Sequence, residues 1–259
     1  MFSLFKKKKK SLKKQNRPII KNDYSNAEII SEYFHKETGI TFEKQMSVLQ
    51  NKLSSFCKIR EIHSFNTLLQ KIKVDEVLKQ ELVDYLTINE TFFYREFKQI
   101  EKLLSMVKEH DKPVKILCAP SATGEEPYSI AIALLQSGVQ ESAFKIVGID
   151  INSQAIQTAK EAVYSKGNVR NLSSEILVKY FNVSQEEYQL REKIKALVTF
   201  KVHNIFDESF SEIGKFDFIF SRNMLIYFDK KTKLKAKEIL ESLRKDKSVD
   251  VFFGHADLF

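Results

Sequence analysis

The sequence predicts an α/β fold in which a doubly wound, mostly parallel sheet follows an N-terminal all-helical domain. Two observations lead to this prediction. After Pro113, short apolar runs of strand length alternate with segments whose apolar residues recur at helical spacing. Such alternation is typical of a parallel sheet that has helices on both faces. Between Asp23 and Leu86 only the helical spacing is found, with a single glycine and no proline.

The composition is that of a globular chain. Of its 259 residues, 43% are hydrophobic and 29% are charged, which is enough apolar material for a core. No window of about 18 residues is apolar throughout and the apolar start is too short for a leader, so we expect neither a membrane span nor a signal peptide. The only cysteines are Cys57 and Cys118, which predicts a cytoplasmic protein without a disulfide framework.

The net charge of +8 is concentrated at the N-terminus, where we expect residues 1–22 to form a basic, disordered tail. Nine of the 42 Lys and Arg residues lie in residues 1–21, where no acid occurs, and the rest of the chain is almost neutral. A neutral body argues against nucleic acid as a partner. The tail is either a solubilising arm or an electrostatic tether, since each lysine of Lys6–Lys10 contributes about 1 kcal/mol near an anionic membrane surface.

The first structured element predicted is a domain over residues 23–86, with apolar spacing that indicates about four helices. Residues 87–112 follow as a linker and a connecting helix. That helix is expected over Phe97–Glu109, because Pro113 cannot continue it.

Residues 113–259 are predicted to form the sheet domain. Residues 165–196 interrupt its strand–helix alternation with a polar stretch, which we interpret as a surface insertion. Strands are expected over Val114–Cys118, Phe144–Ile149, Leu197–Val202, Phe216–Phe220 and Val249–Phe253, and helices over Tyr128–Gln136, Gln154–Val163 and Lys230–Arg244.

The residues that follow the strands are the first candidates for a binding site, because ligands of such sheets bind at the carboxyl ends of the strands. A loop of small residues leads from the first strand to Glu125 and Glu126. Two carboxylates at a helix start disfavour a pyrophosphate and suit a cationic group. Asp150 follows the second strand, where it either accepts hydrogen bonds from ribose hydroxyls or caps the next helix.

Polar residues also follow the third and fourth strands, as His203-Asn204-Ile205 and Arg222-Asn223. Asn223 could equally cap the turn that follows. In the linker, Asn89, Thr91 and Arg95 alternate with aromatic residues. That segment is either a packed junction or, as is common between domains, part of a ligand site. The histidines and cysteines show no metal-ligand spacing, so no metal is expected.

Several short motifs resemble the signatures of the chemotaxis protein methyltransferase (CheR) family, and the resemblance extends over about residues 25–258. They are Asn89-x-Thr-x-Phe-x-x-Arg95, Thr123-Gly-Glu-Glu-Pro-Tyr-Ser129, His203-Asn204, Arg222-Asn-x-x-Ile-Tyr-Phe228 and Gly254-His255. The resemblance implies a class I S-adenosylmethionine-dependent methyltransferase with a Rossmann-like sheet. It also implies that the insertion at 165–196 is a small β-subdomain.

The resemblance further implies an S-adenosylmethionine pocket over the sheet. Glu125 would hold the methionine amino group and Asp150 the ribose, while Arg95 and Tyr227 match the residues that the family places beside the transferred methyl group. The other implied cofactor-binding residues are Asn89, Thr91, Asn204, Ile205, Arg222 and Asn223.

The implied reaction is esterification of glutamate side chains on the cytoplasmic domains of chemoreceptors, with S-adenosylhomocysteine as the other product. The N-terminal helices would contact the receptor, and the protein would be recruited to membrane receptor arrays as a monomer. A glutamate carboxylate is already ionised at pH 7, so the transfer needs no general base. Arg95 would then orient the carboxylate.

Two alternatives remain open at this point. One is a related methyltransferase that acts on another acceptor. The other is a catalytically weakened cofactor-binding or scaffolding relative, which is suggested because the chain ends soon after Gly254-His-Ala-Asp257.

Overall fold

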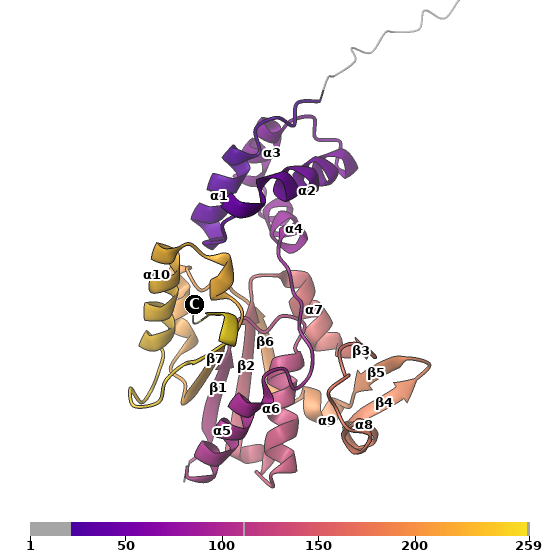
Figure 1. Ribbon diagram of the computed structural model, residues 1–259, viewed down its shortest axis with the longest axis vertical. Coiled ribbons are helices and arrows are strands. Elements are labelled where there is room, and N and C mark those ends of the chain that lie inside the picture. Colours follow the sequence, from indigo (N-terminus) through magenta and orange to yellow (C-terminus); the bar gives the residue numbers. More distant parts are fainter. Residues whose placement is uncertain (1–21, 111, 258–259) are drawn as a thin grey trace, which may run out of the picture.

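The structure is a computed structural model that describes residues 22–110 and 112–257 (Figure 1). A helical domain sits at one end of an α/β domain, and a small antiparallel sheet projects from the side of the latter. The predicted tail with Lys6–Lys10 lies outside the described residues. None of the helices in the described ranges is long and apolar enough to cross a membrane.

The helical domain is built from four α-helices around their own apolar core, which includes Ile30, Leu49 and Phe56. Side chains of Ser64 and Asp75 accept hydrogen bonds from the first turns of the third and fourth helices and so fix where these begin. The helices are α1 (Glu28–Thr38), α2 (Met46–Ile59), α3 (Phe65–Ile72) and α4 (Glu76–Leu86), with a short 3₁₀ helix η1 (Glu43–Gln45) between the first two.

The central sheet has five parallel strands in the order β6-β2-β1-β7-β8, so the prediction of a doubly wound parallel sheet is confirmed. From β1 the chain adds β2 and then β6 on one side of the sheet, and afterwards crosses over to add β7 and β8 on the other side. Such folds bind ligands at the switch point, which here lies between β1 and β7. The strands are β1 (Val114–Cys118), β2 (Phe144–Asp150), β6 (Val198–Val202), β7 (Phe218–Ser221) and β8 (Phe252–Phe253). The last is shorter than the predicted strand Val249–Phe253.

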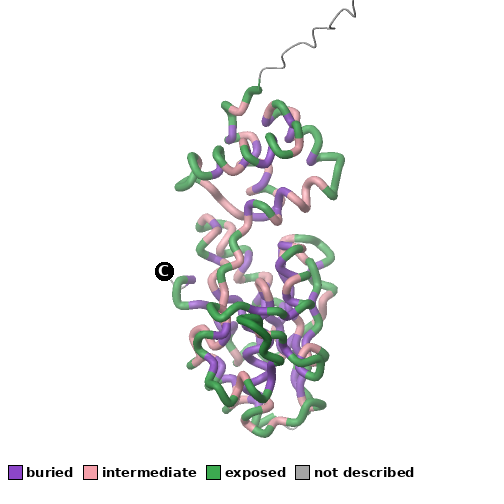
Figure 2. Tube along the Cα trace, turned by 90° about the vertical axis from the view of Figure 1, so that its right-hand side faces the viewer, coloured by how far each residue is buried: buried purple, intermediate pink, exposed green. Residues whose placement is uncertain are grey.

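Helices cover both faces of this sheet. One face packs against α5 (Phe97–Lys108), α6 (Glu125–Gln136) and α7 (Ser153–Glu161), and the other against α10 (Lys230–Ser242). Figure 2 shows the buried segments concentrated inside this domain, with a smaller buried centre in the helical domain. Short 3₁₀ helices lie at η2 (Glu141–Ala143), η3 (Glu208–Ile213), η4 (Leu225–Tyr227) and η5 (His255–Asp257).

The expected surface insertion is a compact antiparallel sheet in the order β3-β5-β4. It begins earlier than the expected residue 165, because α7 ends at Glu161 and the chain enters a strand directly instead of remaining helical to Val163. Its elements are β3 (Val163–Ser165), α8 (Ser174–Tyr180), β4 (Phe181–Ser184), β5 (Glu187–Leu190) and α9 (Glu192–Lys195).

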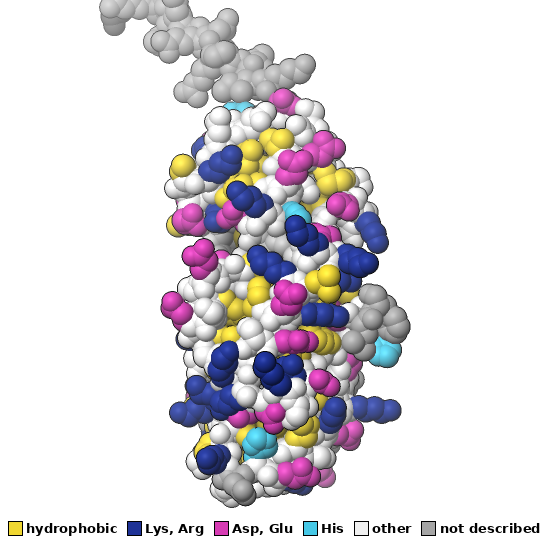
Figure 3. All heavy atoms as spheres, turned by 90° about the vertical axis from the view of Figure 1, so that its left-hand side faces the viewer, with side chains coloured by type: hydrophobic (Ala, Val, Ile, Leu, Met, Phe, Trp, Pro, Cys, Tyr) yellow, Lys and Arg dark blue, Asp and Glu magenta, His cyan; other side chains and the backbone are white. Residues whose placement is uncertain are grey.

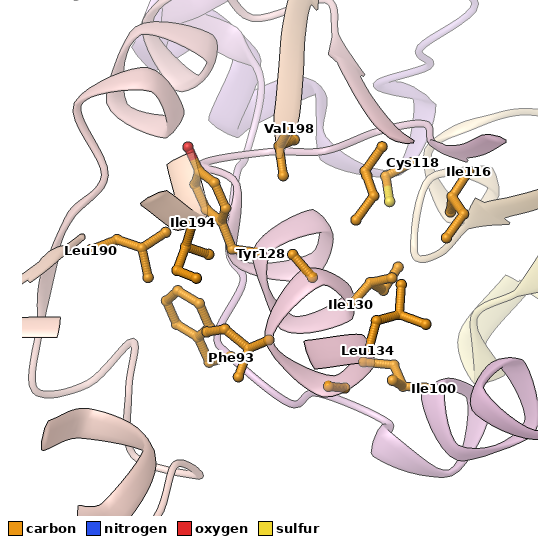
Figure 4. Packing of buried hydrophobic residues seen from close by; sticks show 14 of the residues in the cluster. Phe93, Ile100, Ile116, Cys118, Tyr128, Ile130, Leu134, Leu190, Ile194 and Val198 are labelled. Carbon is orange, nitrogen blue, oxygen red and sulfur yellow. The ribbon is translucent and has the colours of Figure 1, made fainter. Parts of the chain in front are cut away.

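Phe93 of the linker anchors this insertion to the rest of the domain. It is fully buried, and its ring makes edge contacts with Tyr164 at 4.9 Å and Phe181 at 5.4 Å between centroids. Figure 4 shows it in the same apolar cluster as Ile194 and Tyr128. The aromatic run of the linker therefore packs the junction and also fixes the course of the chain past the sheet.

Hydrogen bonds at both α4 and α1 join the helical domain to the sheet domain. At α4, the Asp84 carboxylate accepts from the backbone N–H of Ser153 at 2.7 Å and from its hydroxyl at 2.5 Å. At α1, His35 Nε2 lies 2.6 Å from Asp229 Oδ2. The cavity described in the next subsection lies between these two sets of hydrogen bonds.

We predict that Phe93→Ala lowers the free energy of unfolding by about 3–5 kcal/mol, because it leaves a cavity between linker and insertion. Phe92→Ala is the matched control: its half-buried ring lies under the Arg170 guanidinium, so its loss should cost about 1 kcal/mol. Urea denaturation of both variants measures the difference. Equal losses would contradict the anchoring role of Phe93.

Candidate functional site

A cavity of about 750 Å³ lies where the carboxyl ends of β1, β2, β6 and β7 face the linker and the segment 40–45 of the helical domain. This size falls within the range of about 300–1,000 Å³ that is usual for small-molecule sites. The sequence-predicted site residues that line it are Asn89, Thr91, Arg95, Asp150, Asn204, Ile205, Arg222, Asn223 and Tyr227. The fold therefore brings together predicted side chains from the ends of β2, β6 and β7 and from the linker.

The loop between β1 and α6 lies close to the second strand and to α7. Gly124 has a φ of 95°, and a Cβ at this position would lie 2.9 Å from that of Ala159, so a larger residue is excluded. The backbone N–H of Ala122 donates to Asp150 Oδ2 at 2.8 Å. The small residues of this loop thus let its backbone approach the strand end directly.

Asp150 is a fixed hydrogen-bond acceptor at the end of β2. Its Oδ1 accepts from the N–H of Asn152 at 2.9 Å and its Oδ2 from Ala122. Burial raises its pKa to about 6, although these N–H donors oppose the rise. Asn152, and not Asp150, caps α7 through its side chain, so the alternative role that the sequence left open for Asp150 is excluded.

Arg222 and Glu126 form a buried ion pair beside the cavity. The Nε of Arg222 donates to Glu126 Oε2, and its Nη1 donates to the backbone carbonyl of Arg95 at 2.7 Å. One guanidinium therefore connects the end of β7, the start of α6 and the linker. Glu126 Oε1 and the hydroxyl of Ser121 are buried polar atoms for which the described residues provide no partner.

Glu125 is the one predicted site residue that does not line the cavity. Its carboxylate is fully buried and accepts from the Thr123 hydroxyl and the Asn168 amide, both at 2.7 Å. It thus faces the insertion, and its neighbour Glu126 faces the cavity. Adjacent residues of a helix point about 100° apart, so only one of the two can turn toward the sheet edge.

The chain after β7 is held in place by the carboxylate of Asp257. This group accepts backbone N–H bonds from Asn223, from Leu225 at 2.8 Å and from Gly254 at 3.1 Å. Asn223 adopts a left-handed conformation with a φ of 59° and does not cap the turn that follows, because the N-cap position of η4 is Met224. The clamp by Asp257 was not predicted, because its three partners come together only in the tertiary structure.

Gly254 leaves no space for a side chain beside this clamp. A Cβ there would lie 2.7 Å from the backbone nitrogen of Asn223 and 2.9 Å from Asp257 Oδ2. The glycine of the Gly254-His255 motif is thus required for close approach to the loop that carries Arg222.

Arg95 and Tyr227 both line the cavity, and the charge of Arg95 acts on the Tyr227 hydroxyl. Arg95 Nη1 donates to the carbonyl of Glu90 at 3.2 Å, which leaves most of its donors available. Burial raises the pKa of Tyr227, and the positive charge of Arg95 opposes this rise. The Tyr227 hydroxyl therefore stays protonated at neutral pH and can donate a hydrogen bond next to a cation.

Asn204 connects the helical domain to the end of β6 at the edge of the cavity. Its Nδ2 donates to the carbonyl of Glu37 at 2.7 Å, and its Oδ1 accepts from the N–H of Phe206 at 3.0 Å. The neighbouring Ile205 is buried and supplies an apolar part of the wall. Sequence reasoning missed the wall residues Ile40–Gln45, Lys230 and Lys233, whose approach to the sheet depends on how the two domains dock.

The arrangement suits an uncharged nucleoside joined to a charged group. It offers an oriented acceptor for a diol at Asp150, apolar walls, and the Arg95–Tyr227 pair. The described residues contain no group of three His, Cys, Asp or Glu that could hold a metal ion.

Comparison with known proteins identifies close relatives. Residues 89–259 match the family model "CheR methyltransferase, SAM binding domain". The chemotaxis protein methyltransferase of Campylobacter jejuni strain 81-176 is 37% identical over 222 residues, which cover 85% of this chain and 84% of that protein.

Two further relatives match over similar lengths. The chemotaxis protein methyltransferase of Borreliella burgdorferi is 31% identical over 231 residues, covering 83% and 81% of the two chains. Chemotaxis protein methyltransferase 2 of Vibrio cholerae is 32% identical over 240 residues, covering 87% and 83%.

We predict that affinity for S-adenosylmethionine falls as the pH drops through about 6. In the native protein the Asp150 carboxyl has a pKa of about 6, above its ordinary value of 3.8, so it is protonated below that pH and loses acceptor strength. The affinity should be constant above neutrality and fall by up to about tenfold per unit below it.

Calorimetry on the native protein and on Asp150→Asn tests this prediction. The amide cannot ionise, so the variant should bind more weakly at neutral pH and show a flat profile across the same range. An unchanged pH profile in Asp150→Asn would assign the titration to another group.

We also predict that Gly254→Ala weakens cofactor binding and destabilises the fold by about 1–3 kcal/mol, because the new Cβ forces the loop away from Asp257. Gly167→Ala serves as its control, since a Cβ at this position would meet no atom nearer than 3.5 Å. Thermal unfolding with and without S-adenosylhomocysteine compares the two. A Gly254→Ala protein that behaves like the control would contradict the steric argument.

Proposed function

The chain belongs to the CheR methyltransferase family, and on this premise we propose that it methylates glutamate side chains of chemoreceptors. The methyl group comes from S-adenosylmethionine, and the products are glutamate methyl esters and S-adenosylhomocysteine. The observation that carries the proposal is the pair formed by Arg95 and Tyr227 on the cavity wall, which suits a carboxylate acceptor.

The cavity residues fit the cofactor. Asp150 presents two oxygens fixed by backbone amides, as a ribose diol requires, and Ile205 with Ile149 offers an apolar surface for a base. The buried hydroxyl of Ser121 and Glu126 Oε1 are further polar atoms without a partner among the described residues. When bound, S-adenosylmethionine supplies a methyl group that is activated by the positive charge on sulfur.

The protein's own contribution is positioning. A glutamate carboxylate is ionised at neutral pH, so no side chain has to remove a proton. The Arg95 guanidinium offers planar donors that match a carboxylate, and Tyr227 donates one further hydrogen bond. Good alignment of two reactants is worth about 7–11 kcal/mol, which is enough to account for most of a large rate enhancement.

Arg95 must not bind the acceptor carboxylate too tightly before the methyl group is transferred. A guanidinium that bound the carboxylate equally tightly before and during the transfer would not lower the barrier. Arg95 also donates to Glu90 and is only half-buried, so part of its charge is screened by solvent. These features support a role in orienting the acceptor and not in capturing it.

The partner that we propose is the cytoplasmic part of a chemoreceptor, and the place of action is the membrane receptor array. The test is transfer of radiolabelled methyl groups from S-adenosylmethionine to membranes that contain the organism's own chemoreceptors. Label on the receptors that is released as methanol in base supports carboxyl methylation. No receptor label, or base-stable label, despite cofactor binding would contradict it and favour a different acceptor or a weakened enzyme.

We predict that Arg95→Ala lowers kcat/KM for receptor methylation by about 100-fold, because misplacement of the reacting group by about 1 Å has an effect of that size. Arg170→Ala should leave kcat/KM almost unchanged, although its guanidinium lies over the same Phe92 ring, at 3.6 Å against 5.7 Å for Arg95. Arg170 is exposed and does not line the cavity. Wild-type rates in Arg95→Ala would exclude the positioning role.

A further inference from the structure

Helix α10 carries an unusual number of lysines in its first eight residues. The helix has only two acidic residues, Glu238 and Glu241, and both come after the lysines. The lysines are Lys230, Lys231, Lys233, Lys235 and Lys237.

Helix stability does not explain this placement. The N-terminus of a helix carries a partial positive charge, so cations in its first turns are unfavourable. Lysines four residues apart, such as Lys231 with Lys235 and Lys233 with Lys237, repel each other as well. The Asp229 cap offsets part of this cost through its bonds to Thr232. Because these lysines destabilise their own helix, we infer that they serve a function in binding and not in folding.

Part of this charge forms a stripe that begins at the cavity. Lys230, Lys233, Leu234 and Lys237 are spaced as i, i+3, i+4 and i+7, which places them on one flank of α10. Lys230 and Lys233 line the cavity, and Lys237 Nζ lies 5.3 Å from the centre of the Phe253 ring in β8. Figure 3 shows many Lys and Arg side chains on the face that carries α10, with Asp and Glu side chains among them.

Exposed apolar side chains accompany the stripe. Leu234 lies within it and is 57% exposed, and Ile226 on the rim of the cavity is 44% exposed. A surface that joins basic and apolar groups in a row at helical spacing is complementary to an acidic amphipathic helix.

We propose that this lysine stripe (Lys230, Lys233, Leu234 and Lys237) docks an acidic helical segment of the substrate protein, next to the glutamate that enters the cavity. The inference rests on the proposed function, since that function makes the partner a protein with glutamate side chains. The stripe is continuous with the cavity, so a helix lying on it would present its side chains at the mouth. The charge would also steer the acidic partner during encounter.

The opposite flank of the same helix provides a matched control. Lys235 lies on that flank, and its Nζ is 5.3 Å from the ring of Phe206, the same separation as between Lys237 and Phe253. Lys237→Glu and Lys235→Glu therefore change the net charge alike, and each removes one cation–π contact of the same length. They alter opposite flanks of the helix, and Lys235 is the more exposed of the two.

The test measures binding of a purified cytoplasmic chemoreceptor fragment and the KM for its methylation. Lys237→Glu should raise both the Kd and the KM by about fivefold, leave kcat nearly unchanged and make the salt dependence of binding shallower. Lys235→Glu should stay within about twofold of the native protein. Adding Lys230→Glu to Lys237→Glu should weaken fragment binding further.

Equal effects of the two single variants would overturn the proposal, because they would reflect net charge alone. No effect of Lys237→Glu would also overturn it, as would a loss of binding to anionic vesicles in Lys237→Glu with fragment binding intact. If the native protein binds the fragment through the stripe without methylating it, the docking surface stands and the proposed function fails.

Discussion

The architecture of the site depends on the buried guanidinium of Arg222. It bonds the Glu126 carboxylate at the start of α6 and the carbonyl of Arg95 in the linker, while its own backbone continues from β7. Removal of one partner from a buried ion pair typically costs about 3–5 kcal/mol, because the remaining charge stays buried. A single side chain thus fixes a strand end, a helix start and the segment that carries the proposed orienting residue.

Further contacts fix the remaining walls of the cavity relative to Arg222 and its partners. Asp257 binds three N–H groups around the loop after Arg222, and Gly254 allows the chain to pass within contact of that loop. Asn204 ties the helical domain to the end of β6. The cavity therefore belongs to neither domain alone, and its lining includes Lys44 of the helical domain as well as Lys230 and Lys233 of α10. Cofactor and protein substrate would meet at this junction.

Much of this could be predicted from the sequence, because the geometry of a parallel sheet places the residues after each strand at one edge. That rule alone located Asp150 and Arg222 on the same cavity wall. It could not decide between Glu125 and Glu126, since both begin one helix and only tertiary packing determines which faces the sheet. The Asp257 clamp and the wall at Ile40–Gln45 also depend on contacts between segments that are distant in the chain. The charge of α10 was visible in the sequence, but its division into two flanks required the packing of Ala236 and Leu240.

We infer that the cavity framed by Arg222 and Asp150 is the cofactor site, with its reactive end toward Arg95 and Tyr227. A crystal structure with S-adenosylhomocysteine would reveal the position of the cofactor. We expect the ribose hydroxyls to bind the Asp150 carboxylate and the homocysteine sulfur to lie on the side of Arg95 and Tyr227. A nucleoside bound elsewhere, or one with its sulfur turned away from this pair, would contradict it.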